Sequence, residues 1–319
     1  MEIRALTFFT ELPINTDKQQ MEQQIAPLGK QALQVKKLFT DAGFAVQSLR
    51  LASQPLEKIF PEGASAEQLA LFASQYEQVA NQAGFKHVAL GTLGASLSTD
   101  EASTENSLIK QLMAGIPAII EATDWVFTSV QLADQANGLK TDCLPSAAQV
   151  VVDNSTIKED GFGNLRYCMV ANMPAFSPFF PAAWHDGNSS TAFSMAIESA
   201  DPIVDLLETF DNTDHLGATL DQLGTEAAAL TNITYRGIDM TPSPYPSIPR
   251  SFGRIVELLT NEPFGGPGTM AAIGLIKQSL DAANFNRAGY CAVMLLPLED
   301  AVLAQNAISE NFNIATLLA

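Results

Sequence analysis

Short apolar segments with the character of β-strands alternate with amphipathic, helix-like segments along the whole chain. The expected strands cover residues 3–10, 45–51, 86–90, 125–132, 166–171, 192–197, 233–238 and 291–296. The expected helices cover residues 28–41, 65–84, 107–114, 117–122, 142–152, 202–209, 213–230, 251–259 and 269–282. This alternation favours mostly parallel strands with helices on both faces of the sheet. Because the strands are short and occur over the whole length, we expect a barrel-like α/β fold with residues 1–319 in a single domain.

The charge balance excludes several classes of partner. Lys and Arg number 17 against 35 Asp and Glu, which gives a formal net charge of −18. A negative field of this size repels nucleic acid and anionic membrane surfaces. No apolar run reaches the ~18 residues of a membrane-spanning helix, and the N-terminal segment lacks the basic start of a signal peptide. The 3 cysteines lie far apart in the sequence. We therefore expect a reduced, cytoplasmic protein that binds a small molecule, and a homo-oligomer is compatible with the sequence.

The segment 173–201 concentrates proline, aromatic residues, one histidine and several carboxylates between two expected strands. His185 precedes Asp186, and an imidazole beside a carboxylate can act as an acid, a base or a metal ligand near neutral pH. The alternative is a loop histidine whose hydrogen bonds are already made. The two other histidines carry less weight, since we expect His87 to lie in the core and His215 to be solvated.

Polar side chains follow most of the expected strands, where parallel α/β proteins bind ligands. These residues are Glu11, Gly91, Thr92, Asn172, Glu198, Asp239, Glu299 and Asp300. Converging carboxylates bind a cation or raise the pKa of one member, which gives a general acid beside a general base. We therefore expect Glu198 to act with His185 and Asp186, Asp239 and Asp300 to bind a divalent metal, and Asn172 to contact the ligand. The alternative is that such carboxylates are helix N-caps, and Asp300 fits that alternative well.

Two loops are candidate anion sites. Residues 261–269 form a glycine-rich turn before an apolar helix, and backbone N–H groups of Gly265, Gly266, Gly268 and Thr269 would hold an anionic group there. The turn is neither a P-loop nor a dinucleotide-binding fingerprint, and its alternative is a tight turn with Pro267 at the first helical position. In the proline-rich loop 241–250, Arg250 would pair with a substrate carboxylate, unless the loop is only a rigid surface crossover.

Several motifs in order resemble family 711 of the domains of unknown function. They lie at residues 171–174, 177–185, 193–201, 237–239, 264–269 and 294–300. The resemblance implies an α/β barrel similar to that of pyruvate formate-lyase and other glycyl radical enzymes, but no settled reaction and no established catalytic residues. Sequences of this family continue into a Cys- and Gly-rich segment where this chain stops, so the resemblance implies a C-terminally truncated member. Residues 287–290 have one spacer too few for the glycyl radical pattern Arg-x-x-Gly-Tyr.

Three functions are compatible with these observations. The first is an enzyme that acts on a small polar or anionic metabolite by acid/base or metal-assisted chemistry, with a divalent metal as the candidate cofactor. The second is a non-catalytic protein that binds or senses such a molecule. The third is a degenerate relative of the glycyl radical enzymes. That function requires a cysteine in the pocket, although Cys168 and Cys291 lie in strand-like runs where a free cysteine usually packs as a small hydrophobic residue.

Overall fold

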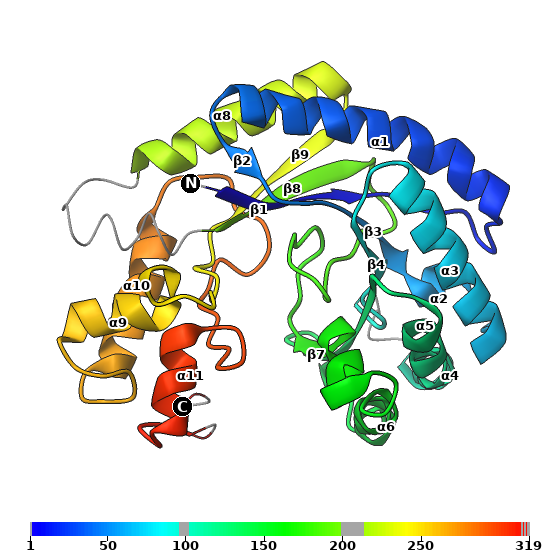
Figure 1. Ribbon diagram of the computed structural model, residues 1–319. Coiled ribbons are helices and arrows are strands. Elements are labelled where there is room, and N and C mark those ends of the chain that lie inside the picture. The colour runs from blue at the N-terminus through cyan, green and yellow to red at the C-terminus, as the bar shows by residue number, and fades with distance from the viewer. Residues whose placement is uncertain (1, 96–101, 199–213, 314, 316, 318–319) are drawn as a thin grey trace.

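The computed structural model describes residues 2–95, 102–198, 214–313, 315 and 317 (Figure 1). The strands are β1 (Glu2–Phe9), β2 (Ala45–Val46), β3 (Leu49–Pro55), β4 (His87–Gly91), β5 (Val126–Asp134), β6 (Gly138–Leu139), β7 (Tyr167–Ala171), β8 (Ala192–Glu198) and β9 (Thr234–Asp239). The α-helices are α1 (Lys18–Asp41), α2 (Leu56–Ile59), α3 (Ala66–Gln82), α4 (Ala102–Ala114), α5 (Ile116–Ala122), α6 (Leu144–Asn154), α8 (Asp214–Thr231), α9 (Phe252–Thr260), α10 (Thr269–Ala282) and α11 (Ala301–Ile308). Two 3₁₀ helices cover Glu159–Arg166 and Ile248–Arg250.

These strands form one 9-stranded sheet in the order β6-β5-β4-β3-β1-β8-β9, with β2 beside β1 and β7 beside β5. Pairing is parallel except between β1 and β8 and between β5 and β6. The prediction of an α/β fold with mostly parallel strands is confirmed in this form. Closure of the sheet into a barrel, and a single domain, stay predictions.

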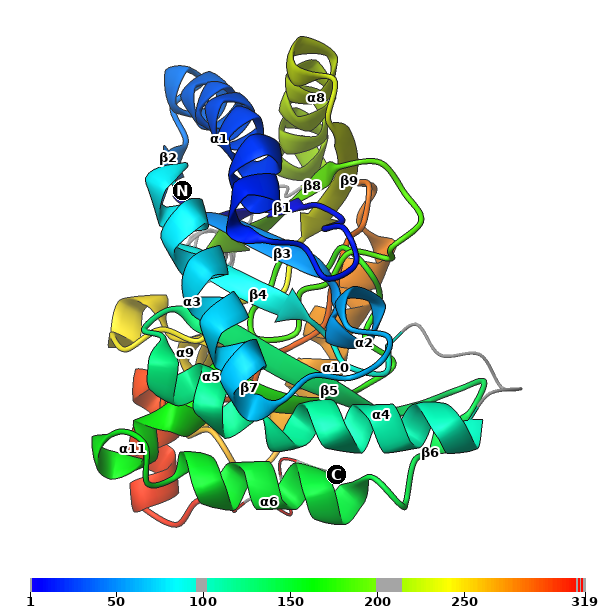
Figure 2. The same ribbon diagram turned by 90° about the vertical axis from the view of Figure 1, so that its right-hand side faces the viewer.

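The sheet is curved, and helices cover its outer side. Figure 1 shows the strands along an arch with α8, α1, α3 and α5 outside it, and Figure 2 shows α1 and α3 crossing over the strands. Leu6 and Phe8 of β1 belong to the same buried apolar cluster as Ile25 of α1 and Tyr76 of α3. Alternate side chains of each strand thus form the main core with the helices, and the other set faces the inner, concave side.

Two helices begin at the residues that their caps predict. Asp17 and Ser65 each form a capping box, in which the side chain accepts from the backbone of the third helical residue and a glutamine side chain bonds back. The helix expected at residues 65–84 is α3, which begins after the box at Ser65.

Residues 172–191 cover much of the concave face of the sheet. Small hydroxyl side chains of the strands hold this segment by its backbone: Thr7 donates to the Pro178 carbonyl at 2.8 Å, and Ser194 donates to the Phe176 carbonyl at 2.8 Å. The segment's aromatic side chains complete the packing, since Phe176 meets Phe9 edge-on with the ring centroids 5.4 Å apart. Packing against the sheet therefore accounts for much of the unusual composition of this segment.

One expected strand is wrong. Residues 291–296 form no strand, and Cys291 has a positive φ of 42°. The N–H of Cys291 donates to the Asp239 carboxylate at 3.1 Å, and the N–H of Ala292 donates to the Thr241 hydroxyl at 3.1 Å. These backbone groups are therefore bound to side chains instead of a strand ladder. The expected helix 202–209 lies outside the described residues, as does the side chain of His215.

Candidate functional site

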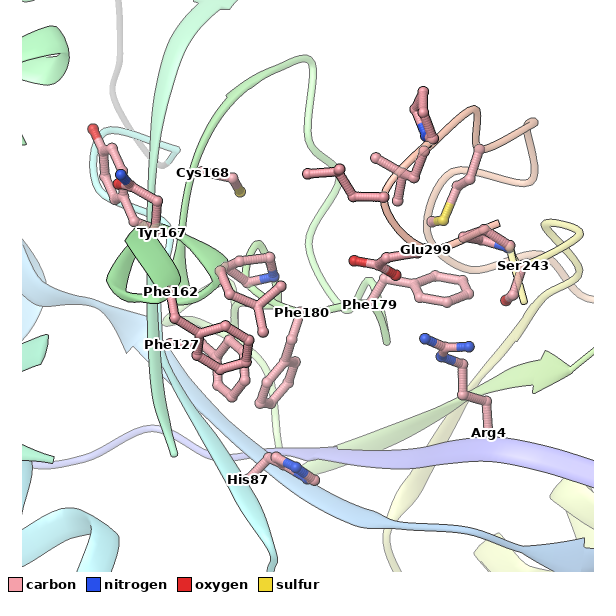
Figure 3. A pocket seen from close by; sticks show the side chains of 18 of the residues that line it. Arg4, His87, Phe127, Phe162, Tyr167, Cys168, Phe179, Phe180, Ser243 and Glu299 are labelled. Carbon is pink, nitrogen blue, oxygen red and sulfur yellow. The ribbon is translucent and has the colours of Figure 1, made fainter. Parts of the chain in front are cut away.

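A cavity of about 880 Å³ lies on the concave face, where the parallel strands begin (Figure 3). Arg4 comes from β1, Arg50 from β3, His87 from β4 and Cys168 from β7. Apolar walls are supplied by Phe127, Tyr167, Phe179, Phe180, Pro181, Pro244, Met294, Leu296 and Leu298. A concave, mostly apolar site with a few polar groups is typical of small-molecule binding. The site was expected at the carboxyl ends of the strands, and this cavity is at the opposite edge.

Arg4 reaches the cavity because β1 is irregular at this point. The pairing of β1 with β8 shifts between Ile3 and Ala5, so Arg4 is an extra residue in β1, and such bulges redirect side chains. Its Nη1 donates to Glu198 Oε2 at 3.0 Å, and the Glu198 side chain is 1% exposed. Glu198, one of the three predicted catalytic residues, thus acts as the counter-ion of Arg4 in this structure.

Arg50 is poorly matched by its surroundings. Its Nε donates to the Ser48 hydroxyl at 3.1 Å, and its guanidinium carbon lies 5.2 Å from the centroid of the Phe180 ring. The described part of the chain offers this side chain no other hydrogen bond and no ion pair within 4 Å. Burial, and then the positive charge of Arg4, lower the pKa of Arg50 to about 10, while Glu198 opposes the shift. Arg50 therefore stays charged at neutral pH and keeps N–H groups available for an anion.

His87 lies beside Arg50, because the two residues are paired across β3 and β4. Its ring meets Trp125 edge-on with the centroids 5.0 Å apart. Burial, followed by the charges of Arg50 and Lys86, lowers the pKa of His87 to about 4, so the imidazole is neutral at pH 7. Nδ1 is buried and lacks a hydrogen-bond partner among the described residues. Since a buried N–H without a partner costs more than a lone pair, we assign the proton to Nε2. His87 was expected in the core and instead lines the cavity.

The predicted pair His185 and Asp186 lies near the opposite edge, where the His185 N–H donates to the Ser53 carbonyl at 3.0 Å. The His185 side chain is 0% exposed, and burial is the main cause that lowers its pKa. Its Nδ1 accepts from the Gly187 N–H at 3.0 Å, and its Nε2 lies 3.4 Å from the Ser190 carbonyl. Asp186 accepts from the N–H groups of Asn188 and Ser189. These contacts close a tight turn, and a catalytic role for the pair stays a prediction.

The two predicted metal ligands are separate, and both hold backbone. Asp239 accepts from the N–H groups of Thr241, Tyr290 and Cys291. Asp300 is the N-cap of α11 and accepts from the N–H groups of Leu303 and Phe252 and from the Ser251 hydroxyl. Among the described residues, no three His, Cys, Asp or Glu side chains are grouped so that they could hold a metal ion. The N-cap alternative for Asp300 is confirmed.

The predicted ligand-binding residues are also apart from the cavity. Asn172 is exposed at the end of β7, with a φ of 52°, and its Oδ1 accepts from the Gln135 N–H at 2.8 Å. Arg250 donates to Glu2 at 3.1 Å and stacks on Tyr245, 3.9 Å from the ring centroid.

The glycine-rich turn closes on itself. The Gly265 N–H donates to the Thr269 hydroxyl at 3.0 Å, and the Gly266 N–H donates to the Pro263 carbonyl at 2.9 Å. Gly268 is the left-handed N-cap of α10. The glycine-rich turn does not line the cavity, and neither does Arg250. Anion binding at these residues therefore stays a prediction.

Sequence reasoning missed Arg4, Arg50 and His87. A signal was present, since Arg50 stands between two leucines and is the one charged residue of its strand, Leu49–Pro55. A charged residue at the inward positions of an otherwise buried strand is unusual unless the charge is used or paired.

The fold and this cavity define a mixed α/β protein with a charged pocket at the strand starts of a mostly parallel sheet. The chain belongs to the family described as "Uncharacterised ACR (DUF711)", whose model matches residues 1–319.

Its relatives include three UPF0210 proteins. The one from Lachnoclostridium phytofermentans is 26% identical over 275 residues, which cover 80% of this chain and 59% of the relative. The one from Actinobacillus pleuropneumoniae is 21% identical over 273 residues, covering 81% and 59%. The one from Thermoanaerobacter sp. (strain X514) is 21% identical over 314 residues, covering 91% and 68%. The chain thus spans about three fifths of the first of these relatives. In the described part of the chain, no helix is both long and apolar enough to cross a membrane.

Proposed function

We propose that this protein binds a small organic anion in the cavity at the strand starts, with Arg50 as the anchor for a carboxylate. The observation that carries the proposal is a charged guanidinium in the wall of a cavity of about 880 Å³, with one hydrogen bond to the described part of the chain. An arginine in such a place is costly to leave unmatched, and a bidentate carboxylate would satisfy it. The neutral His87 beside it would donate Nε2–H to the same anion.

The charge and fold support the same kind of partner. A net charge of −18 disfavours nucleic acid, whereas a local arginine can still attract a small anion. We include a barrel in the proposal, since the curved, mostly parallel sheet with helices on its outer side is compatible with one. Under this proposal the fold is similar to the pyruvate formate-lyase barrel.

A catalytic form of the proposal is favoured by one observation, the neutral imidazole of His87 next to Arg50. A neutral imidazole that donates Nε2–H can polarise a carbonyl group of a bound ligand. The ligand would then be converted on long incubation with the wild-type protein and recovered unchanged with the His87→Gln variant. Recovery of unchanged ligand from both proteins would leave a binding function without catalysis.

Binding is tested by isothermal titration calorimetry with two carboxylates, 3-phenylpropanoate and L-phenylalanine. We expect Arg50→Gln to weaken binding of whichever probe binds by at least tenfold, because a charge-assisted pair is lost. The matched control is Arg254→Gln, whose arginine side chain is 39% exposed and lies 3.9 Å from Glu257. If neither probe binds the wild-type protein, or if both arginine variants bind as tightly as it does, the proposal is wrong.

A further inference from the structure

The ionised side chains of the cavity carry both signs. Arg4 is matched by Glu198 at 3.0 Å, so this pair contributes little net field to a ligand. Arg50 and Glu299 are the two charged lining residues that remain. Figure 3 shows the Glu299 carboxylate pointing into the cavity, above Arg4.

Glu299 is held at the cavity by its neighbours in the chain. Asp300 next to it is 1% exposed and is fixed by hydrogen bonds from Phe252 at 2.7 Å and from Leu303 at 3.0 Å. The N–H of Glu299 closes a turn onto the Leu296 carbonyl at 3.0 Å. In the described part of the structure, the Glu299 carboxylate makes no hydrogen bond, and no cationic side chain lies within 4 Å of it. The buried Asp300 therefore positions a carboxylate that is itself unmatched.

The rest of the lining is mostly apolar and largely aromatic. Phe127 and Phe180 meet edge-on with their centroids 5.3 Å apart, and Phe179 and Met294 line the same space. Aromatic walls of this kind favour a ligand with an aromatic or branched apolar body. A dianion such as a phosphate monoester is disfavoured, because one unmatched cation cannot balance two charges in a site that also presents Glu299.

We propose that the cavity recognises a zwitterion, an amino carboxylate with an apolar or aromatic side chain, whose carboxylate meets Arg50 and whose ammonium group meets Glu299. This rests on the proposed function and names the ligand class of the same site. The cavity volume of about 880 Å³ accommodates a single amino acid or a dipeptide.

The test measures binding of two zwitterions, L-phenylalanine and L-phenylalanyl-L-phenylalanine. They are compared with 3-phenylpropanoate, which lacks the ammonium group, and with 2-phenylethylamine, which lacks the carboxylate. We expect at least one zwitterion to bind tenfold more tightly than both singly charged analogues. Glu299→Gln should weaken binding of that zwitterion about tenfold and leave 3-phenylpropanoate binding unchanged or stronger. The control Glu262→Gln removes an exposed carboxylate that is not part of the cavity and should change nothing.

The outcomes separate the two proposals. The proposal of a zwitterionic ligand is wrong if 3-phenylpropanoate binds as tightly as both zwitterions, or if Glu299→Gln and Glu262→Gln have the same effect. The proposal of anion binding at Arg50 is not affected by either result. If no probe binds in a manner that depends on Arg50, both proposals fail. Glu299→Gln is close to isosteric at a half-buried position, and its melting curve confirms that the variant is folded.

Discussion

The two ends of the concave face each carry a histidine whose pKa is lowered by burial, and the two histidines differ in how their nitrogens are used. At one end, both nitrogens of His185 face backbone groups of the same short turn. At the other end, His87 lines a cavity beside Arg50. Among the residues that the structure describes, Nδ1 of His87 has no hydrogen-bond partner and the Arg50 side chain has one. Reactive residue types are therefore present at both ends, but polar groups without a hydrogen-bond partner among the described residues lie together only at the end with His87 and Arg50. Hydrogen-bond satisfaction distinguishes a turn from a candidate site better than residue type does.

The largest effect expected from this comparison is at His185. His185→Ala removes a fully buried ring, its two hydrogen bonds and its contact with Phe176, whose centroid lies 5.3 Å away. We expect the free energy of unfolding to fall by about 3 kcal/mol, measured by urea denaturation. His87→Ala is the matched control and should cost about 1 kcal/mol, since that ring is half-buried and Nδ1 has no partner to lose. Equal losses at the two positions would break the comparison.

The alternation of strands and helices was predictable, because period and length survive in the local sequence. The direction of β8 was not. β8 runs antiparallel to β1, and this depends on how residues 172–191 cross the concave face. The strand expected at 291–296 failed for a related reason, since the apolar pattern does not reveal that Asp239, distant in sequence, binds the N–H groups of Tyr290 and Cys291.

The candidate site was less predictable than the fold. Asp300 could be read as an N-cap because a cap is a local feature, and the structure confirms it. Arg4 faces the cavity through a bulge, and Arg50 meets His87 only when β3 and β4 pair. The local sequence does not determine where a bulge occurs or in which register two strands pair. The convergence of these side chains therefore could not be derived from the sequence alone.

Glu57 is an exception at the end of the sheet where His185 lies. Its Oε1 accepts from the Gly94 N–H at 2.8 Å, whereas Oε2 is buried without a hydrogen-bond partner among the described residues. Burial raises the pKa of Glu57 from 4.5 to about 7, opposed by hydrogen bonds from backbone N–H groups and by the charges of Lys58 and Lys140. The polar groups at this end are therefore not all hydrogen-bonded, and Glu57 gives a second test of the comparison.

The sign of the resulting pH dependence follows from linkage. Between pH 4.5 and about 7 the folded protein holds a proton on Glu57 that the unfolded chain releases. This contribution to stability is therefore complete below pH 4.5 and is lost as the pH rises through 7. Glu57→Gln removes the titration, so the variant should gain up to about 3 kcal/mol on the wild type between pH 4.5 and pH 8. Urea denaturation at both pH values measures the gain. Glu62→Gln, at an exposed carboxylate, should show no such difference, and a similar gain there would attribute the effect to net charge instead.

The smallest effect expected is at Arg50, and it has the opposite sign to that at His185. Arg50→Met removes a charge that burial disfavours and that one hydrogen bond supports, so the unliganded protein should become more stable by about 1 kcal/mol. The control is Arg166→Met, which removes a guanidinium that donates to the Thr123 hydroxyl at 3.0 Å and to the Ile120 carbonyl. That variant should lose about 3 kcal/mol, because the acceptors would remain buried without donors. Thermal unfolding of both variants without ligand decides the question. If Arg50→Met were destabilised as strongly as Arg166→Met, Arg50 would contribute to the packing of the folded protein. The polar groups at the cavity would then be matched within the protein, like those of the turn around His185.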